Sequence, residues 1–480
     1  MEVESKSERS SLFHTDESKI SFESERSHLN QNLDGGEDKS DVFEKRKACD
    51  IKSNFILLSI LFSANHGTVV ACLSLAVARL GRLGNVQSSV LYLSYTVSAL
   101  IGATYVVKVL GARNSMIVGM WIYCIYVGCF VLATAMPKGG EIAAILGALI
   151  GGVGGGFLWT AQGSYFVRAS EEYSKAKGVS LEDATSLFSG IFAGIYLGEE
   201  VCLHLFSTFM IQFWNWSWLT IYVGYTVVAV VSTLGMRFVQ KYPLTQKEVL
   251  ENASTSSFYK ATVTFRLMMS DPKMKYMIPL TAVFAFSASF VASFVSGEVV
   301  AMALDDEKSY YIGIFTSFTA GVAALASVLF GHIAHIYGNS FILIIGILSF
   351  STIPSLFLVN PNLREGWGLG SLIFIYTLQG IGRATFEGSL KAQFAVIFPK
   401  EKEGAFANII FQDGLASTFG FALATSLPCH KEGSYCIKYL DGTLHNVLVY
   451  EVLIMVTATF AFFSYFRALH LHKLERLAIV

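Results

Sequence analysis

The sequence predicts an all-α polytopic membrane protein, with about twelve transmembrane helices in two six-helix bundles. The chain of 480 residues is 53% hydrophobic and only 15% charged, whereas a soluble domain carries about 25% charged residues. Apolar runs recur along nearly the whole chain, each close to the roughly 20 residues that cross a bilayer as a helix. The longest internal hydrophilic segment divides these runs into two sets of six.

The chain divides into five segments by composition. Residues 1–50 are rich in Ser, Glu, Asp and Lys, which predicts a disordered cytoplasmic tail because few apolar groups are available for burial. This tail lacks the short apolar core of a cleaved signal peptide near Met1. Residues 51–238 form the predicted N-terminal bundle, 239–275 a cytoplasmic linker, 276–470 the C-terminal bundle, and 471–480 a cytoplasmic tail.

The expected spans follow from the apolar runs, with boundaries good to a few residues. Those of the N-terminal bundle lie near residues 53–78, 87–109, 115–136, 141–166, 184–211 and 218–238. Those of the C-terminal bundle lie near residues 276–303, 310–335, 339–359, 368–390, 403–427 and 446–469.

Basic residues in the connecting loops predict the orientation, because cytoplasmic loops of membrane proteins carry an excess of Lys and Arg. The segment before the first span and the central linker are rich in both, whereas the loop around QFWNWSW has neither. Both termini and the linker are therefore expected in the cytoplasm, in either the plasma membrane or an endomembrane. The loop with Cys429 and Cys436 then faces the outside or a lumen, where these cysteines are a candidate disulfide.

The stretch GGVGGG, residues 151–156, is the most unusual in the chain. It has no strand context, and Phe157 takes the last position of a G-x-G-x-x-G pattern, so a nucleotide loop is excluded. On a helix, Gly151 and Gly155 share one face, which predicts close packing against a neighbouring helix and permits sliding or bending there. Trp159 and Gln162 follow at the cytoplasmic end of this span, as packing or gating residues.

Acidic residues inside two predicted spans are candidate ligands for a proton or cation, because a charge at mid-membrane costs about 2.5–3.5 kcal/mol on insertion. Glu199 and Glu200 lie near the middle of the fifth span and Asp413 lies in the eleventh. Since adjacent helical residues point about 100° apart, at most one of the two glutamates faces a central site squarely. The alternative for each acid is a hydrogen-bonded structural role.

Two further pairs of residues complete the candidate site. Arg383 and Glu387 are four residues apart in the tenth span, so we expect them to share a helical face and neutralise each other, or to form a gate or substrate clamp. His66 and Asn65 lie in the middle of the first span, as part of a proton relay or as satisfied core residues.

Several classes of function are excluded or disfavoured. The net charge of −1 offers no basic surface for nucleic acid. The seven cysteines show no paired metal-binding spacing, and neither a Walker motif nor a catalytic triad is present. We therefore expect no enzymatic activity, no cofactor and no metal; the bilayer and a small solute or cation are the expected partners.

Four stretches carry a resemblance to a known family. They are VVKVLGARNSMIVG (106–119), GFLWTAQGSYF (156–166), QGIGRATFEG (379–388) and FPKEKEGAFANIIFQDGLAS (398–417). Over residues 50–470, the chain resembles the Unc-ninety-three-like (uncoordinated-ninety-three) family of the major facilitator superfamily. Lys108 and Arg113 fall in its basic turn between spans two and three; Lys108 stands where the general facilitator turn has Asp.

The resemblance implies a major facilitator fold and leaves two functions open. Some members look like transporters, with cation homeostasis implicated, while others act as regulatory subunits of channels or as escorts of receptors. We expect a secondary transporter of a small solute or cation that works by alternating access, coupled to a proton or cation. The alternative is a regulatory or escort subunit that kept the fold and lost transport.

Overall fold

The computed structural model describes residues 39–479, apart from 102, 137, 243–256, 307, 361–365, 399–401, 428–429, 433–434 and 438–446. The described chain is built of helices, with one small antiparallel hairpin of β1 (His430–Glu432) and β2 (Tyr435–Ile437). The all-α membrane class predicted from the apolar runs is confirmed.

The helices of the N-terminal half follow one another through short turns. They are α2 (Lys39–Leu80), α3 (Arg82–Ile101), α4 (Ala103–Leu110), α5 (Ala112–Ala135), α6 (Gly140–Lys177), α7 (Leu181–Trp214), α8 (Trp218–Gly235) and the 3-10 turn η1 (Met236–Phe238). 

The C-terminal half contains two π-helical segments within its long rods. Its helices are α10 (Ser257–Ser270), α11 (Pro272–Phe290), the π-helix η2 (Val291–Val299), α12 (Val300–Leu304), α13 (Tyr310–Tyr337), α14 (Asn339–Val359), α15 (Leu369–Ala384), the π-helix η3 (Thr385–Leu390), α16 (Lys391–Ile397), α17 (Lys402–Ser426) and α18 (Leu448–Ile479).

Nine helical rods among the described residues are long and apolar enough to cross a membrane. The other three expected spans correspond to α3 with α4, to α15 with η3 and α16, and to α17. The first and last of these carry many polar side chains, and a π-helix interrupts the middle one. The twelve expected spans therefore all have a helical counterpart.

Local sequence signals explain where the connected helices α6 and α7 end and begin. Gly178 follows α6 with a φ of 67°, a left-handed conformation that favours glycine, and its N–H donates to the carbonyl of Ser174. Ser180 then caps α7, since its side chain accepts a hydrogen bond from the N–H of Asp183. The turn between the two long helices is therefore determined by its own residues.

The first helix corrects the expected extent of the N-terminal tail. Helix α2 begins at Lys39, so residues 39–50 continue the first span instead of belonging to a disordered segment. Ala48 is buried, and the Lys47 Nζ lies 3.9 Å from a carboxylate oxygen of Glu172 on α6. This stretch is helical because Glu, Lys, Arg and Ala favour a helix and α6 offers it a packing surface. Residues 1–38 lie outside the described chain.

The predicted linker contains the helix α10. The carbonyl of Thr264 on α10 accepts a hydrogen bond of 2.9 Å from the Asn408 side chain on α17. Asn408 is fully buried. Part of the linker is therefore packed against the C-terminal half.

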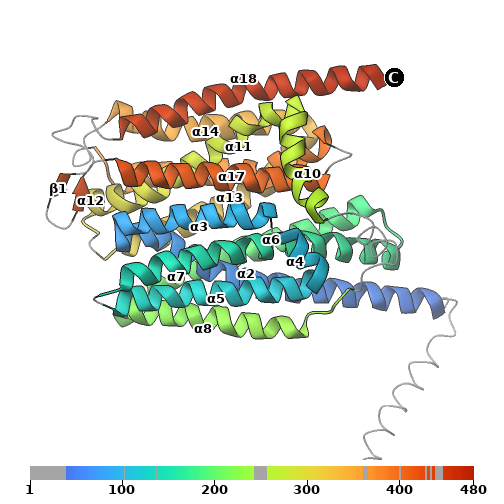
Figure 1. Cartoon of the computed structure of the whole chain (residues 1–480), viewed down its shortest axis with the longest axis horizontal. Coiled ribbons are helices and arrows are strands. Elements are labelled where there is room, and N and C mark those ends of the chain that lie inside the picture. The colour runs from blue at the N-terminus through green and yellow to red at the C-terminus, as the bar shows by residue number, and fades with distance from the viewer. Residues whose placement is uncertain are drawn as a thin grey trace, which may run out of the picture.

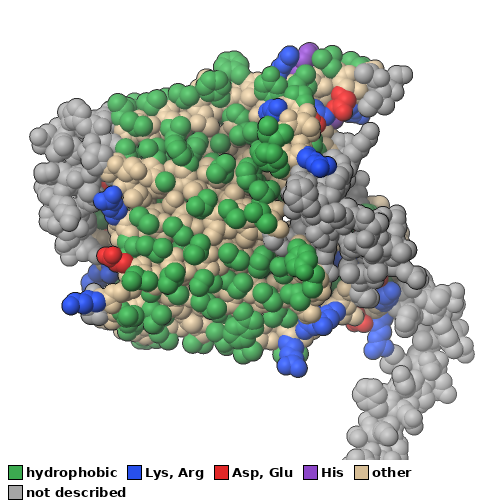
Figure 2. Space-filling view, in the orientation of Figure 1, with side chains coloured by type: hydrophobic (Ala, Val, Ile, Leu, Met, Phe, Trp, Pro, Cys, Tyr) green, Lys and Arg blue, Asp and Glu red, His purple; other side chains and the backbone are tan. Residues whose placement is uncertain are grey.

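The two ends of the bundle are distinct (Figure 1). The β1–β2 hairpin lies at one end, named here the hairpin end, while the start of α2, helix α10 and the C-terminal end of α18 lie at the other, named here the linker end. On the face shown in Figure 2, hydrophobic side chains cover the middle and the described Lys and Arg side chains lie toward the two ends. This distribution suits a multi-pass membrane protein in which the start of α2 and the end of α18 lie at the same end of the bundle.

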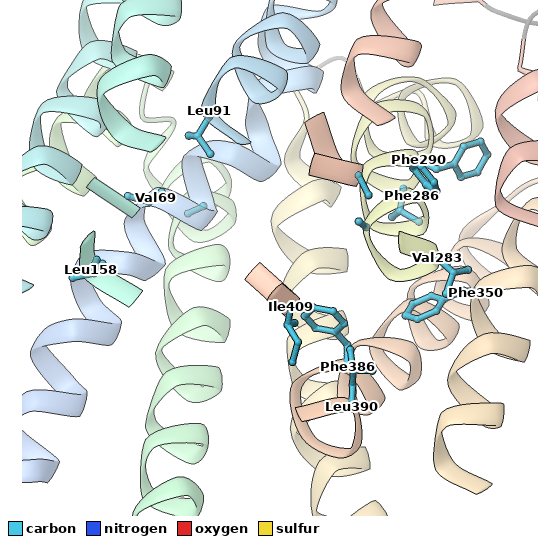
Figure 3. Close-up of a cluster of buried hydrophobic side chains, with 14 of the residues drawn as sticks. Val69, Leu91, Leu158, Val283, Phe286, Phe290, Phe350, Phe386, Leu390 and Ile409 are labelled. Carbon is cyan, nitrogen blue, oxygen red and sulfur yellow. The ribbon is translucent and has the colours of Figure 1, made fainter. Parts of the chain in front are cut away.

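The apolar core extends through both halves. Figure 3 shows buried side chains from α2, α3 and α6 of the N-terminal half and from α11, α14, η3 and α17 of the C-terminal half. Helix α3 packs directly against α17 across the boundary between the halves. The charged residues described next lie at this boundary.

Candidate functional site

A buried salt bridge joins the two halves. Arg383 on α15 donates from Nη1 to Glu200 Oε1 over 2.6 Å and from Nη2 to Oε2 over 2.8 Å, with Glu200 on α7. The Glu200 side chain is 3% exposed and that of Arg383 16%. A bidentate arginine–carboxylate pair is among the stronger charge-assisted contacts in proteins, because both hydrogen bonds are aligned at once.

Histidine and serine extend this salt bridge into the N-terminal half. His204 lies one helical turn after Glu200, and its Nε2 is 3.5 Å from Glu200 Oε1. Its Nδ1 lies 3.4 Å from the hydroxyl of Ser74 on α2. The two polar groups support the carboxylate from its own half, so Glu200 is held in place on both sides.

The expected pairing of Arg383 with Glu387 is wrong. Arg383 pairs with Glu200, and Glu387 instead accepts a hydrogen bond of 2.7 Å from Lys391. The reason is that each side chain has another partner. Glu200 offers Arg383 a bidentate contact from another helix, and the i,i+4 pair that forms in this segment is Glu387 with Lys391.

The two adjacent glutamates lie in different surroundings. Glu200 is buried in the salt bridge between the halves, whereas Glu199 is half-buried and forms no ion pair within the described part of the chain. Of the two, only Glu200 belongs to the boundary between the halves.

Asp413 forms a second charged group at the same boundary. Its Oδ1 is buried and has no hydrogen-bond partner among the described residues. The next residue, Gly414, is so close to α3 that an added Cβ would lie 2.2 Å from Thr96 Oγ1 and 3.2 Å from Tyr95 Cδ1. The charges of Glu387 and Lys391 act on Asp413, which places the three side chains in one electrostatic group.

Aromatic side chains surround His66 in the N-terminal half. Its ring centroid lies 5.0 Å from that of Trp159, 5.6 Å from Tyr123 and 5.7 Å from Tyr196. The residue is buried, and its Nδ1 has no hydrogen-bond partner among the described residues. The charges of Glu200 and Arg383 act on this ring, so the aromatic cluster borders the salt bridge.

Asn65, unlike His66, forms hydrogen bonds that hold helices of the N-terminal half together. Its Nδ2 donates to the carbonyl of Ala229 over 3.1 Å and lies 3.0 Å from Thr233 Oγ1, both on α8. It also lies 3.4 Å from the carbonyl of Met120 on α5. Because the side chain is fully buried among these helices, Asn65 ties α2, α5 and α8 together and does not line the boundary between the halves.

The glycine stretch lies inside α6, where it permits close contact with α3 and α5. An added Cβ would lie 2.7 Å from Tyr126 Cγ at Gly151 and 2.8 Å from the Tyr123 hydroxyl at Gly155. At Gly152 it would lie 2.0 Å from the hydroxyl of Ser94. The glycines are therefore a packing surface, and Trp159, two turns after Gly152, belongs to the His66 cluster. Gln162 is buried one turn further on.

We expect Gly152→Ala to destabilise the protein by about 1–3 kcal/mol, because the new methyl group would overlap Ser94 and the carbonyl of Leu91 on α3. Thermal unfolding in detergent measures this loss of stability as a lower melting temperature. Gly163→Ala on the same helix is the matched control, since no atom lies within 4 Å of its added Cβ. Equal melting temperatures for both variants would contradict the close packing of α6 on α3.

The remaining predicted residues lie at the ends of the bundle. Arg113, at the start of α5, donates to the carbonyls of Met236 and Arg237 and so satisfies backbone groups after α8. Lys108 belongs to α4, and its side chain lies outside the described part. Cys429 lies outside the described residues, so its disulfide with Cys436 stays a prediction. No group of three or more His, Cys, Asp or Glu side chains in the described chain is placed to hold a metal.

Neither the tyrosines at this site nor the cross-half partner of Arg383 was predicted from the sequence. The charge of Asp413 acts on Tyr92 and Tyr95 of α3. The charges of Glu200 and Arg383 act on Tyr196 of α7. In the sequence these tyrosines look like any aromatic residue in an apolar span. The sequence feature that points to this site is the unusual number of charged residues in the fifth, tenth and eleventh spans.

Comparisons with known proteins agree with this architecture. A family model described as "Ion channel regulatory protein UNC-93" matches residues 82–432. The protein unc-93 homolog A of Xenopus laevis is 23% identical over 394 residues, covering 72% of this chain and 80% of the relative. The human unc-93 homolog A is 22% identical, covering 72% and 81%, and the Arabidopsis thaliana UNC93-like protein 3 is 21% identical, covering 71% and 74%.

Solved structures of similar fold are transporters. The nucleoside transporter NupG superposes with a TM-score of 0.60 at 12% identity, covering 88% of this chain and 99% of that one. The peptide transporter POT gives a TM-score of 0.61 at 13% identity, covering 90% and 99%. At such identities the likeness concerns the fold alone. The family model spans well over half of the chain, so this protein belongs to the UNC-93 family and has the major facilitator fold.

Proposed function

We propose that this protein is a secondary transporter of a small solute or cation, in which two six-helix halves alternate access to a site at their boundary. The observation that carries the proposal is the Glu200–Arg383 salt bridge, because it joins the halves in the middle of the membrane-spanning helices. A contact of this kind has to form and break when two halves rock against each other.

Contacts between the halves continue from this salt bridge toward the hairpin end. Thr208 on α7 donates to the carbonyl of Tyr310 over 3.0 Å, and Ser317 on α13 donates to the carbonyl of Val201 over 3.2 Å. Ser89 on α3 donates to the carbonyl of Thr418 on α17 over 3.0 Å. These contacts, named here the hairpin-end closure, close that end of the boundary.

Opening the hairpin end therefore requires Glu200 and Arg383 to separate. Breaking a buried pair leaves uncompensated charge, which costs about 3–5 kcal/mol when one partner is simply removed. A cation near Glu200 or an anionic group near Arg383 would offset that cost in the open state. The salt bridge thus supplies a physical link between ligand binding and access.

Asp413 is the acid that we assign to the coupling cation. Glu200 is neutralised by Arg383, and Glu387 pairs with Lys391, whereas Asp413 Oδ1 is buried and has no hydrogen-bond partner within the part of the chain that the structure describes. Tyr95, on α3 of the opposite half, packs closely against Gly414, the residue next to Asp413. A carboxylate between the halves, beside a tyrosine of the other half, suits a monovalent cation or a proton that binds and leaves as the halves move.

Flux into proteoliposomes tests this assignment. The wild-type protein is expected to carry a protein-dependent flux of one of a panel of monovalent cations or protons. Asp413→Asn should lower it by at least about tenfold, because the amide keeps the shape and loses the charge. Glu199→Gln is the control, since Glu199 lies outside the boundary, and it should keep most of the flux. Loss of flux in the control but not in Asp413→Asn would contradict the assignment.

The second candidate is a regulatory subunit of an ion channel, favoured by the description of the family model. In that case the wild-type protein carries no flux, and Asp413→Asn leaves the current of a co-reconstituted channel unchanged. We place the hairpin end on the outer or lumenal side in both cases, because the Lys and Arg residues of the linker and termini favour the cytoplasm.

A further inference from the structure

A hollow of about 320 Å³ opens at the hairpin end, away from the charged groups of the proposed transport site. The N-terminal half contributes the end of α2, the end of α7 and the α7–α8 turn, and the C-terminal half contributes the segment between α12 and α13. The lining residues are Arg79, Ile211, Asn215, Trp216, Trp218 and Lys308. The hollow therefore lies across the boundary between the halves.

The charge of the lining is positive. Among the described residues that line it, Arg79 and Lys308 are the two ionisable ones, one from each half. Asp306 is close enough to act on Arg79. However, the Asp306 carboxylate is buried and already accepts the N–H groups of Tyr310 over 2.9 Å and Tyr311 over 2.7 Å, at the start of α13. Within the described chain, neither Arg79 nor Lys308 forms an ion pair with a carboxylate.

The remaining lining is apolar and aromatic. The Arg79 guanidinium carbon lies over the Trp218 ring, 4.9 Å from its centroid, and this cation–π contact positions the group at the hollow. Trp216 and Ile211 add apolar surface. Asn215, held with a φ of 50° at the end of α7, adds an amide.

We propose that this hollow binds a small organic anion, with its acidic group between Arg79 and Lys308 and a flat apolar body against the tryptophans. A planar guanidinium recognises a carboxylate or phosphate by two parallel hydrogen bonds. The ammonium group of Lys308 faces the same ligand from the other half, so the anion bridges the halves and favours the hairpin-end closure. The proposed anion site is compatible with either function, a transporter or a regulatory subunit.

Binding of 4-nitrobenzoate to the purified full chain tests this site. The nitroaromatic group quenches nearby tryptophan fluorescence, and Trp216 and Trp218 both line the hollow. The wild-type protein should show saturable quenching, while the neutral 4-nitrobenzyl alcohol should not. Arg79→Gln and Lys308→Gln should each weaken binding at least about tenfold, by loss of a charged contact.

Two control variants separate charge from folding. Arg82→Gln removes a cation at the same end of the bundle that does not line the hollow, and it should bind as the wild type does. Arg79→Lys keeps the charge but loses the planar bidentate geometry, so it should recover only part of the affinity lost in Arg79→Gln. Unchanged binding in Arg79→Gln and Lys308→Gln, equal weakening by Arg82→Gln, or equal quenching by the alcohol would each overturn the proposal.

The source of the anion is distinguished by the bilayer used. In nanodiscs of phosphatidylcholine, retained binding of 4-nitrobenzoate supports a soluble organic acid as the ligand. Competition by added phosphatidylglycerol that Arg79→Gln abolishes supports an anionic lipid headgroup in the same site. Phosphatidylglycerol competition that persists in both Arg79→Gln and Lys308→Gln would contradict the site.

Discussion

Arg383→Gln is expected to destabilise the protein by about 3–5 kcal/mol, because it leaves Glu200 buried with its charge unpaired. Glu200→Gln should also destabilise it, since it leaves Arg383 without its carboxylate. The double variant should recover part of the loss, because neither charge then remains at the boundary. Thermal or denaturant unfolding in detergent, analysed as a double-mutant cycle, gives the coupling energy.

Lys391→Gln is the matched control for this cycle. Lys391 and Glu387 form an ion pair on the same rod, but their side chains are 42% and 35% exposed, so the loss should be about 0–1 kcal/mol. If Arg383→Gln and Lys391→Gln unfold at the same temperature, the salt bridge between the halves contributes little and cannot control their separation.

Gly313→Leu is expected to hold the hairpin end open. Gly313 on α13 packs so closely on α7 that an added Cβ would lie 2.4 Å from Thr208 Oγ1 and 2.6 Å from the carbonyl of His204. Overlap of this kind costs about 1–3 kcal/mol in the closed form. Such a cost lowers the closed population roughly 5- to 150-fold relative to the open one. Flux in proteoliposomes should fall accordingly.

Accessibility of the hairpin end provides a second measurement for this variant. A cysteine introduced at Ser317, inside the hairpin-end closure, should react faster with a membrane-impermeant maleimide in the Gly313→Leu background. Gly321→Leu is the control on the same helix, because no atom lies within 4 Å of its added Cβ. Normal flux and an unreactive cysteine in folded Gly313→Leu protein would show that the halves do not separate there.

Much of the architecture could be predicted from the sequence, because a bilayer imposes simple rules on each span. A helix in lipid must satisfy its own backbone and bury about 20 apolar residues, and both requirements are local. The rods and the close packing at Gly151 and Gly155 followed from these rules. The helical residues 39–50 did not, since their helicity depends on packing against α6.

The pairing of the charged residues, in contrast, could not be predicted from local sequence rules. The sequence alone determined that Glu199, Glu200, Arg383, Glu387 and Asp413 are costly charges inside apolar spans. It could not determine their partners, because a spacing of four residues does not show which opposite charge lies nearest: Glu387 pairs with Lys391, four residues later, whereas Arg383 pairs with Glu200 on another helix. Only the tertiary structure brought Glu200 of α7 within reach of Arg383 of α15, and left Asp413 Oδ1 buried with no hydrogen-bond partner in the described chain. A buried charge is stabilised by whatever lies nearest in space, and that neighbour can lie anywhere along the chain.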